Sequence, residues 1–377
     1  MRSLLSAYRR TGADRPYGDP LPPHGTGFEG WYWRITQPER GDVVVALCGI
    51  NRDRTGRAWG TVGLAAHPGR FVQAAIAPHA AAQGHAVRLG TVPEGHEMPL
   101  TAAEGDPRRA APRVHARPWA LALDVVDGPA PTRLRVRFDE PARWPRRALG
   151  GVGLGHLFPG LSQYWHPHLL GARVHGHALL DGHRVDLDGA TAYAEKNWGG
   201  GFPRAWWWGQ AHGFDRPDVC VAFAGGALRY GPVRTHATAV VVRVGDELVR
   251  LGEPLLAPVR HTVGDGRWHL RGRGLAGEVE LEGWAAPAEA HDLPVPLPAE
   301  RRHVTGARQH LAGALHVVVR RRGRTLYEGT STLAGLERGE TDPAAGGSVT
   351  SHAPWTSTPR SATSSPAPSP RTSAPAM

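Results

Sequence analysis

The segment best equipped for chemistry is TAYAEKNWGGGFPRAWWWGQAHGF, residues 191–214. It contains Lys196, the only lysine among 377 residues, followed by Asn197, one of two asparagines. Side chains alternate along an extended strand, so Glu195 and Lys196 point to opposite faces. Tyr193 and Asn197 share the face of Glu195, and Trp198 shares the face of Lys196. If Glu195 faces an apolar cavity, burial raises its pKa and makes it a candidate proton donor.

Aromatic residues accompany this carboxyl. The chain holds 13 Trp and 7 Phe, and a buried Trp needs a partner for its N–H, so we expect the walls of an amphipathic cavity. Trp206, Trp207 and Trp208 could stabilise a carbocation with their ring faces, and strand alternation sends one or two of them inward. Gln210, with Lys196 and Asn197, is expected to hold Glu195 in place. The candidate ligand-binding residues are Trp31, Tyr32, Tyr193, Trp198, Trp206, Trp208 and Gln210.

The same residues also have structural interpretations. In one alternative, the Glu-Lys-Asn triplet at 195–197 is a buried ionic network without a catalytic role. Such structural networks also shift the pKa values of ionisable groups. Glu29 in FEGWYWR is a second candidate acid. Its alternative role is structural, as a carboxylate that pairs with an arginine at a strand edge. A buried Lys196 needs a partner, which Asp186 or Asp188 is expected to supply. The catalytic candidates are therefore Glu195, Lys196, Asn197 and Glu29.

The sequence predicts neither a metal nor a cofactor. Two His-x-His pairs, at 166–168 and 175–177, have no third ligand at a recognisable spacing. The glycine run at 150–155 does not follow a strand-to-helix junction, which argues against a nucleotide-binding loop. Cys48 and Cys220 lie in apolar runs and are too few for a disulfide framework.

The net charge of +10 is carried almost entirely by arginine, with clusters at 108–147 and 320–324. Arg133, Arg135 and Arg137 share one strand face without a recognition helix or stacking platform, so we expect a solvated face and no nucleic acid. Peripheral attraction to an anionic membrane surface is the second interpretation. No segment approaches the ~20 apolar residues of a membrane span, and no signal peptide is recognisable, so the expected location is cytoplasmic.

Strand signals recur through the chain and predict an all-β fold. The 49 Gly and 34 Pro interrupt helices, and Asp181-Gly182 and Gly245-Asp246 are expected hairpin turns. About sixteen or seventeen short strands predict antiparallel β-barrel or sandwich domains, such as two barrels of about eight strands. No strand is predicted over 91–118, 141–171 or 287–313. We expect a flexible arm at 1–24, β domains at 25–189 and 190–340, and a disordered Ser/Thr/Pro-rich tail at 341–377.

Four stretches resemble the tocopherol cyclase family: FEGWYWR (28–34), AYAEKNWGGGFP (192–203), WWWGQ (206–210) and LAGLE (333–337). The resemblance implies two lipocalin-like β domains and an isomerase-type enzyme. Such an enzyme protonates an alkene of a prenylated benzoquinol, and a phenol oxygen then closes a chromanol ring. Carotenoid hydratases are similar more distantly, since they add water to a related alkene. Hydration of a carotenoid-type alkene and a non-catalytic lipocalin-like carrier of an isoprenoid or other lipid are the alternatives.

Overall fold

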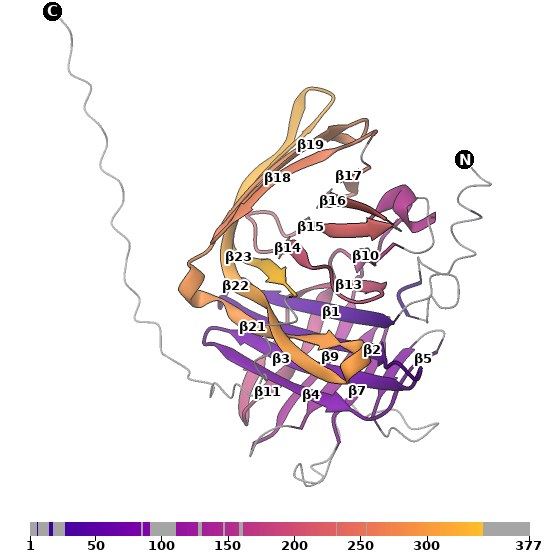
Figure 1. Ribbon diagram of the computed structural model, residues 1–377. Helices are drawn as coiled ribbons and strands as arrows, with labels where there is room; N and C mark the ends of the chain where they lie inside the picture. The colour runs from indigo at the N-terminus through magenta and orange to yellow at the C-terminus, as the bar shows by residue number, and fades with distance from the viewer. Residues whose placement is uncertain are drawn as a thin grey trace, which may run out of the picture.

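The computed structural model consists of two curved antiparallel β-sheets, one above the other in Figure 1. The structure describes residue 6 and residues 15–17, 27–83, 86–90, 111–126, 130–145, 148–157, 161–230, 232–253 and 255–341. The predicted all-β fold of two antiparallel domains is confirmed. The predicted disordered tail, from residue 342 on, and most of the predicted N-terminal arm lie outside the described residues. Within the described ranges, no helix is long and apolar enough to cross a membrane.

The first sheet has 13 strands, and β1 and β13 lie side by side within it. These two strands pair from Phe28 opposite Gly199 to Thr36 opposite Thr191. The path across the sheet is β4-β3-β2-β1-β13-β11-β9-β8-β7-β6-β5, with β10 on β13 and β12 on β11. The strands are β1 Phe28–Gln37, β2 Asp42–Arg52, β3 Ala58–His67, β4 Phe71–Ala77, β5 Ala80–Gln83, β6 Ala86–Leu89, β7 Arg113–Arg117, β8 Ala120–Val125, β9 Thr132–Asp139, β10 Gln163–Leu169, β11 Arg173–Leu180, β12 His183–Asp186 and β13 Thr191–Gly199.

The second sheet has 10 strands in the order β17-β16-β15-β14-β23-β22-β20-β19-β18, with β21 paired to β22. Its strands are β14 Ala205–Ala211, β15 Val219–Tyr230, β16 Val233–Val244, β17 Glu247–Leu251, β18 Val259–Gly264, β19 Arg267–Gly274, β20 Gly277–Trp284, β21 His291–Leu297, β22 Arg302–Arg321 and β23 Arg324–Glu340. Short 3-10 turns are η2 Gly153–Leu157, η3 Pro287–Glu289 and η4 Pro298–Glu300.

Strand β1 is buried along most of its length because both of its faces are covered. Trp31 and Trp33 point into the core of the first sheet. On the other face, the Arg34 guanidinium donates to the carbonyl oxygens of Leu311 at 2.7 Å and Leu333 at 2.5 Å. Both carbonyls belong to the second sheet, so a fully buried cation ties the two sheets together.

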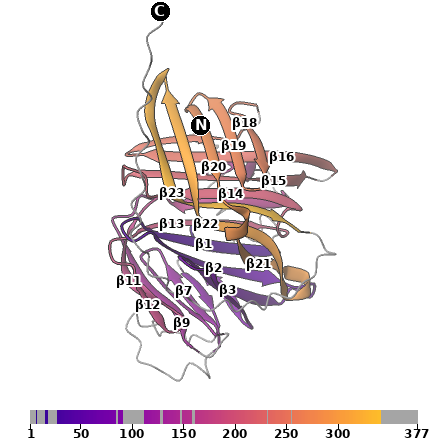
Figure 2. The same ribbon diagram turned by 90° about the vertical axis from the view of Figure 1, so that its left-hand side faces the viewer.

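Strands β21 and β22 extend from the second sheet across the first, as Figure 2 shows beside β2 and β3. Leu293 and Val295 of this extension belong to one apolar cluster with Val43 and Ala65 of the first sheet. The indole N–H of Trp59 donates to a carbonyl in η4 at 3.0 Å. The second sheet therefore covers the outer face of β1–β3 and creates an interior between the sheets.

Both predicted hairpin turns are confirmed. Asp181 and Gly182 have φ of 52° and 82° and join β11 to β12, with Leu180 opposite His183. Positive φ at two consecutive residues fits the right-handed twist of the flanking strands, and Asp-Gly tolerates it. Gly245, with φ of 59°, makes the turn between β16 and β17.

The number of strands per sheet differs from the prediction of two eight-stranded barrels, since the sheets hold 13 and 10 strands. Two of the strands without a sequence prediction, β10 (QYWHPHL) and β21 (HDLPVPL), contain proline. Proline cannot donate to a β ladder and so argues against a central strand. Each of these two strands pairs with only one neighbour, and at such a margin proline is tolerated.

The predicted boundary at residues 189 and 190 differs from the observed sheet pairing. Strand β13 hydrogen-bonds to β1, β10 and β11 of the first sheet. The chain passes to the second sheet between Gly199 and Ala205. The glycine-rich turn that follows β13, and not the hairpin before it, marks the crossing.

Two segments expected at the surface contain buried side chains. Tyr17, in the predicted arm, is 3% exposed, and its hydroxyl donates to the Arg117 carbonyl at 3.1 Å. Arg135, expected on a solvated face, is buried and bonds to Asp124 at 2.5 Å, whereas Arg137 is exposed. The prediction for Arg135 is wrong because a cross-strand carboxylate on β8 compensates its burial.

Candidate functional site

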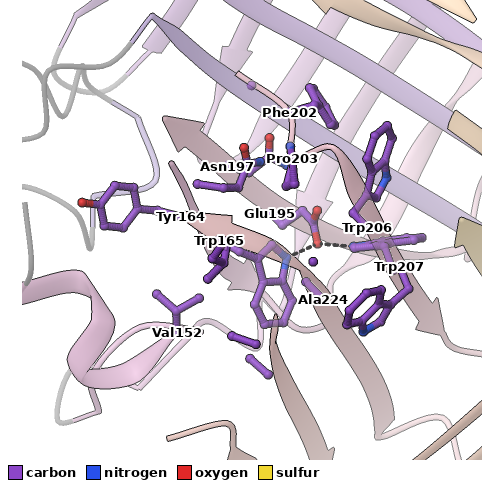
Figure 3. Close-up of a pocket in the computed structure, with 18 of the residues that line it drawn as sticks. Val152, Tyr164, Trp165, Glu195, Asn197, Phe202, Pro203, Trp206, Trp207 and Ala224 are labelled. Atoms are coloured by element: carbon purple, nitrogen blue, oxygen red, sulfur yellow. Dashed lines mark hydrogen bonds between the residues drawn. The ribbon is translucent and has the colours of Figure 1, made fainter. Parts of the chain in front are cut away.

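A cavity of about 590 Å³ lies between the two sheets. Its walls come from β1–β3, β10 and β13 of the first sheet and from β14–β16 and β21–β23 of the second. Residues of η2, of the turn at 202–203 and of the segments 252–253 and 255–256 lie beside them. Most lining side chains are apolar or aromatic. Figure 3 shows Glu195 between the indole of Trp165 on one side and those of Trp206 and Trp207 on the other.

Glu195 presents a buried carboxyl to this cavity. Its Oε2 accepts hydrogen bonds from the Tyr193 hydroxyl at 2.6 Å, the Trp165 indole at 2.7 Å and the Trp208 indole at 2.9 Å. Burial raises the pKa of Glu195, and these donors act against that rise by stabilising the carboxylate. The expected direction of the pKa shift is therefore confirmed.

The partners of Glu195 come from three strands. Alternation along β13 places Tyr193 and Asn197 on its face, and Asn197 also hydrogen-bonds to the carboxyl and lines the cavity. Trp165 arrives through the pairing of β10 with β13, where it stands opposite Asn197. Trp208 is contributed by the second sheet. The sequence singled out Tyr193, Asn197 and Trp208 but had no signal for Trp165, whose strand was not predicted.

Two expected partners of Glu195 lie elsewhere. Lys196 points to the opposite strand face, as alternation predicts, and is absent from the cavity wall. Gln210 is buried beside Arg34, whose guanidinium donates to its Oε1 at 3.3 Å, and its amide nitrogen lies 3.2 Å from His212 Nδ1. The prediction that Lys196 and Gln210 hold Glu195 is therefore wrong, because both face other buried polar groups.

Lys196 pairs with Glu29 behind the cavity wall. The Lys196 Nζ lies 3.6 Å from Glu29 Oε1 and 4.7 Å from the centre of the Trp198 ring. Neither Lys196 nor Glu29 is more than 4% exposed in its side chain, and neither lines the cavity. This pair contradicts two predictions. Lys196 was expected to pair with Asp186 or Asp188, and Glu29 was expected to pair with an arginine. Glu29 stands opposite Trp198 in the β1–β13 register, so strand pairing brings the two charges together.

The predicted aromatic residues divide between the cavity and its surroundings. Tyr32 borders the cavity, and so do Trp206, Trp207 and Trp208. Strand alternation predicted that only one or two of these three tryptophans would face inward. Trp31 also borders it, although its indole N–H donates to the Pro16 carbonyl at 2.7 Å within the first-sheet core. Trp198 stacks on Tyr164 at 5.2 Å between ring centres and does not line the cavity.

Glu337 is a second carboxyl that lines the cavity and that the sequence interpretation did not select. The Trp206 indole donates to its Oε1, and the Gln309 amide donates to its Oε2 at 2.8 Å. Burial, and secondarily repulsion from Glu195, raises the pKa of Glu337 to about 7. The available signal was the LAGLE stretch, whose last residue is this glutamate.

A hydrogen-bonded chain links Glu337 to the first sheet. The Tyr32 hydroxyl donates to Gln309 Oε1 at 2.9 Å, and Gln309 in turn donates to Glu337. Tyr32 stands opposite Glu195 in the β1–β13 register, and its ring meets that of Trp208 edge-on at 5.0 Å. The surroundings of the two carboxyls therefore meet at Tyr32 and Trp208.

The histidines have no place in the cavity wall within the described residues. His166 and His168 are buried, and burial lowers the pKa of both. In the part of the chain that is described, the group with metal-ligand geometry is His269, Glu280 and Glu282, which lies on β19 and β20 away from the cavity wall. The cavity chemistry therefore rests on carboxyl, amide, phenol and indole groups.

Comparisons with known proteins relate part of the chain to a family. The family described as "Tocopherol cyclase-like" matches residues 153–340. "Probable tocopherol cyclase, chloroplastic" of Oryza sativa subsp. japonica is 33% identical over 89 residues, 23% of this chain and 19% of the rice protein. "Tocopherol cyclase, chloroplastic" of Zea mays is 28% identical over 207 residues, 51% of this chain and 42% of the maize protein. The matched regions thus span less than half of either curated relative.

Among solved structures, a crystal structure of CghA superposes with a TM-score of 0.50 at 11% identity, covering 84% of this chain and 88% of that chain. At this identity the likeness concerns the fold alone. The family match includes η2, β10, Glu195 with its partners, and the whole second sheet with Glu337. Residues 153–340 therefore belong to the tocopherol cyclase-like family, as the motifs of the sequence indicated.

Proposed function

We propose that the protein is an enzyme that cyclises a prenylated benzoquinol to a chromanol by acid catalysis. The observation that carries the proposal is the Glu195 carboxyl, which is buried in an aromatic-walled cavity and held on one oxygen by three donors. Protonation of an alkene needs a carboxylic acid that keeps its proton near neutral pH, and burial favours that form. Membership of the tocopherol cyclase-like family supports the same chemistry.

The hydrogen bonds of Glu195 support a proton on one of its two oxygens. An indole N–H can only donate, so Oε2 must accept from Trp165 and Trp208 in both protonation states. A proton on the carboxyl is therefore carried by Oε1. In the proposed reaction Oε1 protonates the alkene, and the phenol oxygen of the same molecule attacks the resulting cation.

The walls of the cavity suit a cationic intermediate. Trp206 and Trp207 border the cavity together with Trp208, and the π face of Trp attracts a cation. The mainly apolar lining excludes water, which would otherwise capture the cation and give an alcohol. Cyclisation leaves the mass of the substrate unchanged, whereas hydration adds the mass of one water molecule.

The test incubates the purified protein with a panel of prenylated benzoquinols and carotenoids and analyses the products by mass spectrometry. We expect a chromanol of unchanged mass, and a loss of about 10²-fold or more in turnover for Glu195→Gln, the usual contribution of a general acid. Glu340→Gln is the matched control, because Glu340 is an exposed carboxyl outside the cavity wall. A hydrated product would favour the hydratase alternative. Tight binding without any product would favour a carrier.

A further inference from the structure

The cavity holds a second carboxyl arranged differently from the first. Glu195 belongs to β13 of the first sheet, and Glu337 to β23 of the second. The indoles of Trp208 and Trp206 donate to them respectively. These two tryptophans lie two positions apart on β14, a rise of roughly 7 Å along a strand. One strand therefore anchors both carboxyls, and both line the same cavity.

The hydrogen bonds around Glu337 fit its ionised form. Its Oε1 accepts from the Trp206 indole, which has no acceptor atom. Its Oε2 accepts from the Gln309 amide, whose own oxygen is occupied by the Tyr32 hydroxyl. Both oxygens of Glu337 thus face donors. Glu195 differs, because the Tyr193 hydroxyl and the indoles of Trp165 and Trp208 all donate to its Oε2. The proton of the neutral acid is therefore carried by Oε1.

The two carboxyls also influence each other electrostatically. Glu195 and Glu337 both line the cavity, and the charge on Glu195 opposes ionisation of Glu337. Two like charges facing a low-dielectric space favour a state in which one carboxyl is protonated and the other ionised. The proposed cyclisation requires a protonated Glu195, so Glu337 is the partner that carries the charge.

We propose that Glu337 is the catalytic base of the cavity, which accepts the phenol proton while Glu195 acts as the acid. This assignment rests on the proposed cyclisation and extends it. Ring closure needs both groups, because one proton joins the alkene and another must leave the attacking hydroxyl. Gln309 and Tyr32 then act as positioning residues that hold the Glu337 carboxylate toward the cavity.

The step balances in atoms and charge. The Glu195 Oε1–H bond breaks, and the proton forms a C–H bond at one alkene carbon as the π bond opens. The phenol oxygen forms a C–O bond to the other alkene carbon, and the phenol O–H proton passes to Glu337. The chromanol is an isomer of the quinol, and the protein is left with Glu195 ionised and Glu337 protonated. Exchange of one proton with solvent at each carboxyl restores the starting state.

The test uses two probes in D₂O, a prenylated benzoquinol and its ether with the attacking hydroxyl methylated. The ether can exchange deuterium into its alkene through the acid but cannot release a phenol proton. We expect Glu337→Gln to lose about 10²-fold in chromanol formation and to retain exchange into the ether. Glu195→Gln should lose both reactions. Glu340→Gln, an exposed carboxyl on the same strand, should retain both.

The outcomes separate this assignment from the proposed function. Cyclisation at the wild-type rate in Glu337→Gln, or an equal loss of cyclisation and exchange, would overturn the role of Glu337 alone. Absence of chromanol and of exchange in the wild type would overturn the proposed function and the assignment with it. If Glu337→Gln does not fold, Gln309→Leu provides the test. It removes a donor from the carboxylate, so the rising limb of the pH–rate profile should move to higher pH, and an unmoved limb would contradict the assignment.

The groups that act on Glu337 come from separate elements. Glu195 faces it from β13, and Tyr32 reaches it from β1 through Gln309 on β22. The burial of Tyr32 raises the pKa of its hydroxyl, which stays protonated and donates in the working pH range. The rising limb therefore reports ionisation of Glu337, and the falling limb reports loss of the Glu195 proton.

Discussion

The two faces of the paired strands β1 and β13 each carry a buried glutamate and large aromatic rings, in opposite electrostatic settings. On one face Glu195 borders the cavity and is surrounded by neutral donors from Trp165, Tyr193 and Trp208. On the other face Glu29 lies 3.6 Å from the Lys196 ammonium, out of the cavity.

The difference shows what makes a buried carboxyl useful as an acid. A cation at close range stabilises the carboxylate, so a carboxyl such as Glu29 is suited to a structural ion pair. Neutral donors stabilise the carboxylate less strongly than a cation, so burial prevails at Glu195 and its pKa stays raised. Alternation along a single strand is sufficient to keep the lysine away from the acid.

The largest expected effect comes from breaking the ion pair. Lys196→Met leaves Glu29 buried without its cation and should destabilise the protein by about 3–5 kcal/mol, measured by urea unfolding. The double variant Glu29→Gln/Lys196→Met should recover much of this loss. Turnover per folded molecule should change little. A stable Lys196→Met protein with lost turnover would mean that the lysine acts on the cavity after all.

The next effect concerns stability against pH. The pKa of Glu337 rises from 4.5 to about 7 on folding, so its contribution is fully present below pH 4.5 and is lost as pH rises through 7. That loss amounts to about 3 kcal/mol. Glu337→Gln should therefore flatten the decline in unfolding free energy between pH 5 and pH 8. Parallel curves for wild type and variant would show that burial does not raise the pKa of Glu337.

A smaller effect should follow from removing one neutral donor. Tyr193→Phe deletes the 2.6 Å hydrogen bond to Glu195, which stabilises the carboxylate, and so raises the pKa of Glu195 further. The falling limb of the pH–rate profile should move to higher pH, with a stability loss of about 1 kcal/mol. Tyr193→Phe leaves the indole donors in place, so folding should persist. An unmoved falling limb would assign that limb to another group.

Sequence periodicity and turn chemistry determined much of the fold. Alternating runs bounded by Gly, Pro and Asp-Gly predicted most strands, because a half-covered strand shows period two and Asp-Gly tolerates positive φ. The composition and motifs also selected Glu195, Asn197 and the Trp206–Trp208 run as cavity residues. Strands with internal proline were missed, since proline at a sheet margin resembles a loop in sequence.

Only the tertiary structure decided which side chains lie beside Lys196 and Glu195. Lys196 meets Glu29 because β1 and β13 pair in one register, and 167 positions separate the two residues along the chain. Trp165 and Glu337 reach the cavity from β10 and β23, whose sequences do not indicate which side chains they meet there. Local sequence governs which face a side chain takes, whereas strand register and the packing of one sheet on another govern what that face meets. The sequence by itself therefore determined the all-β fold and a carboxyl suited to proton donation, and the packing of the two sheets decided that a second carboxyl shares its cavity.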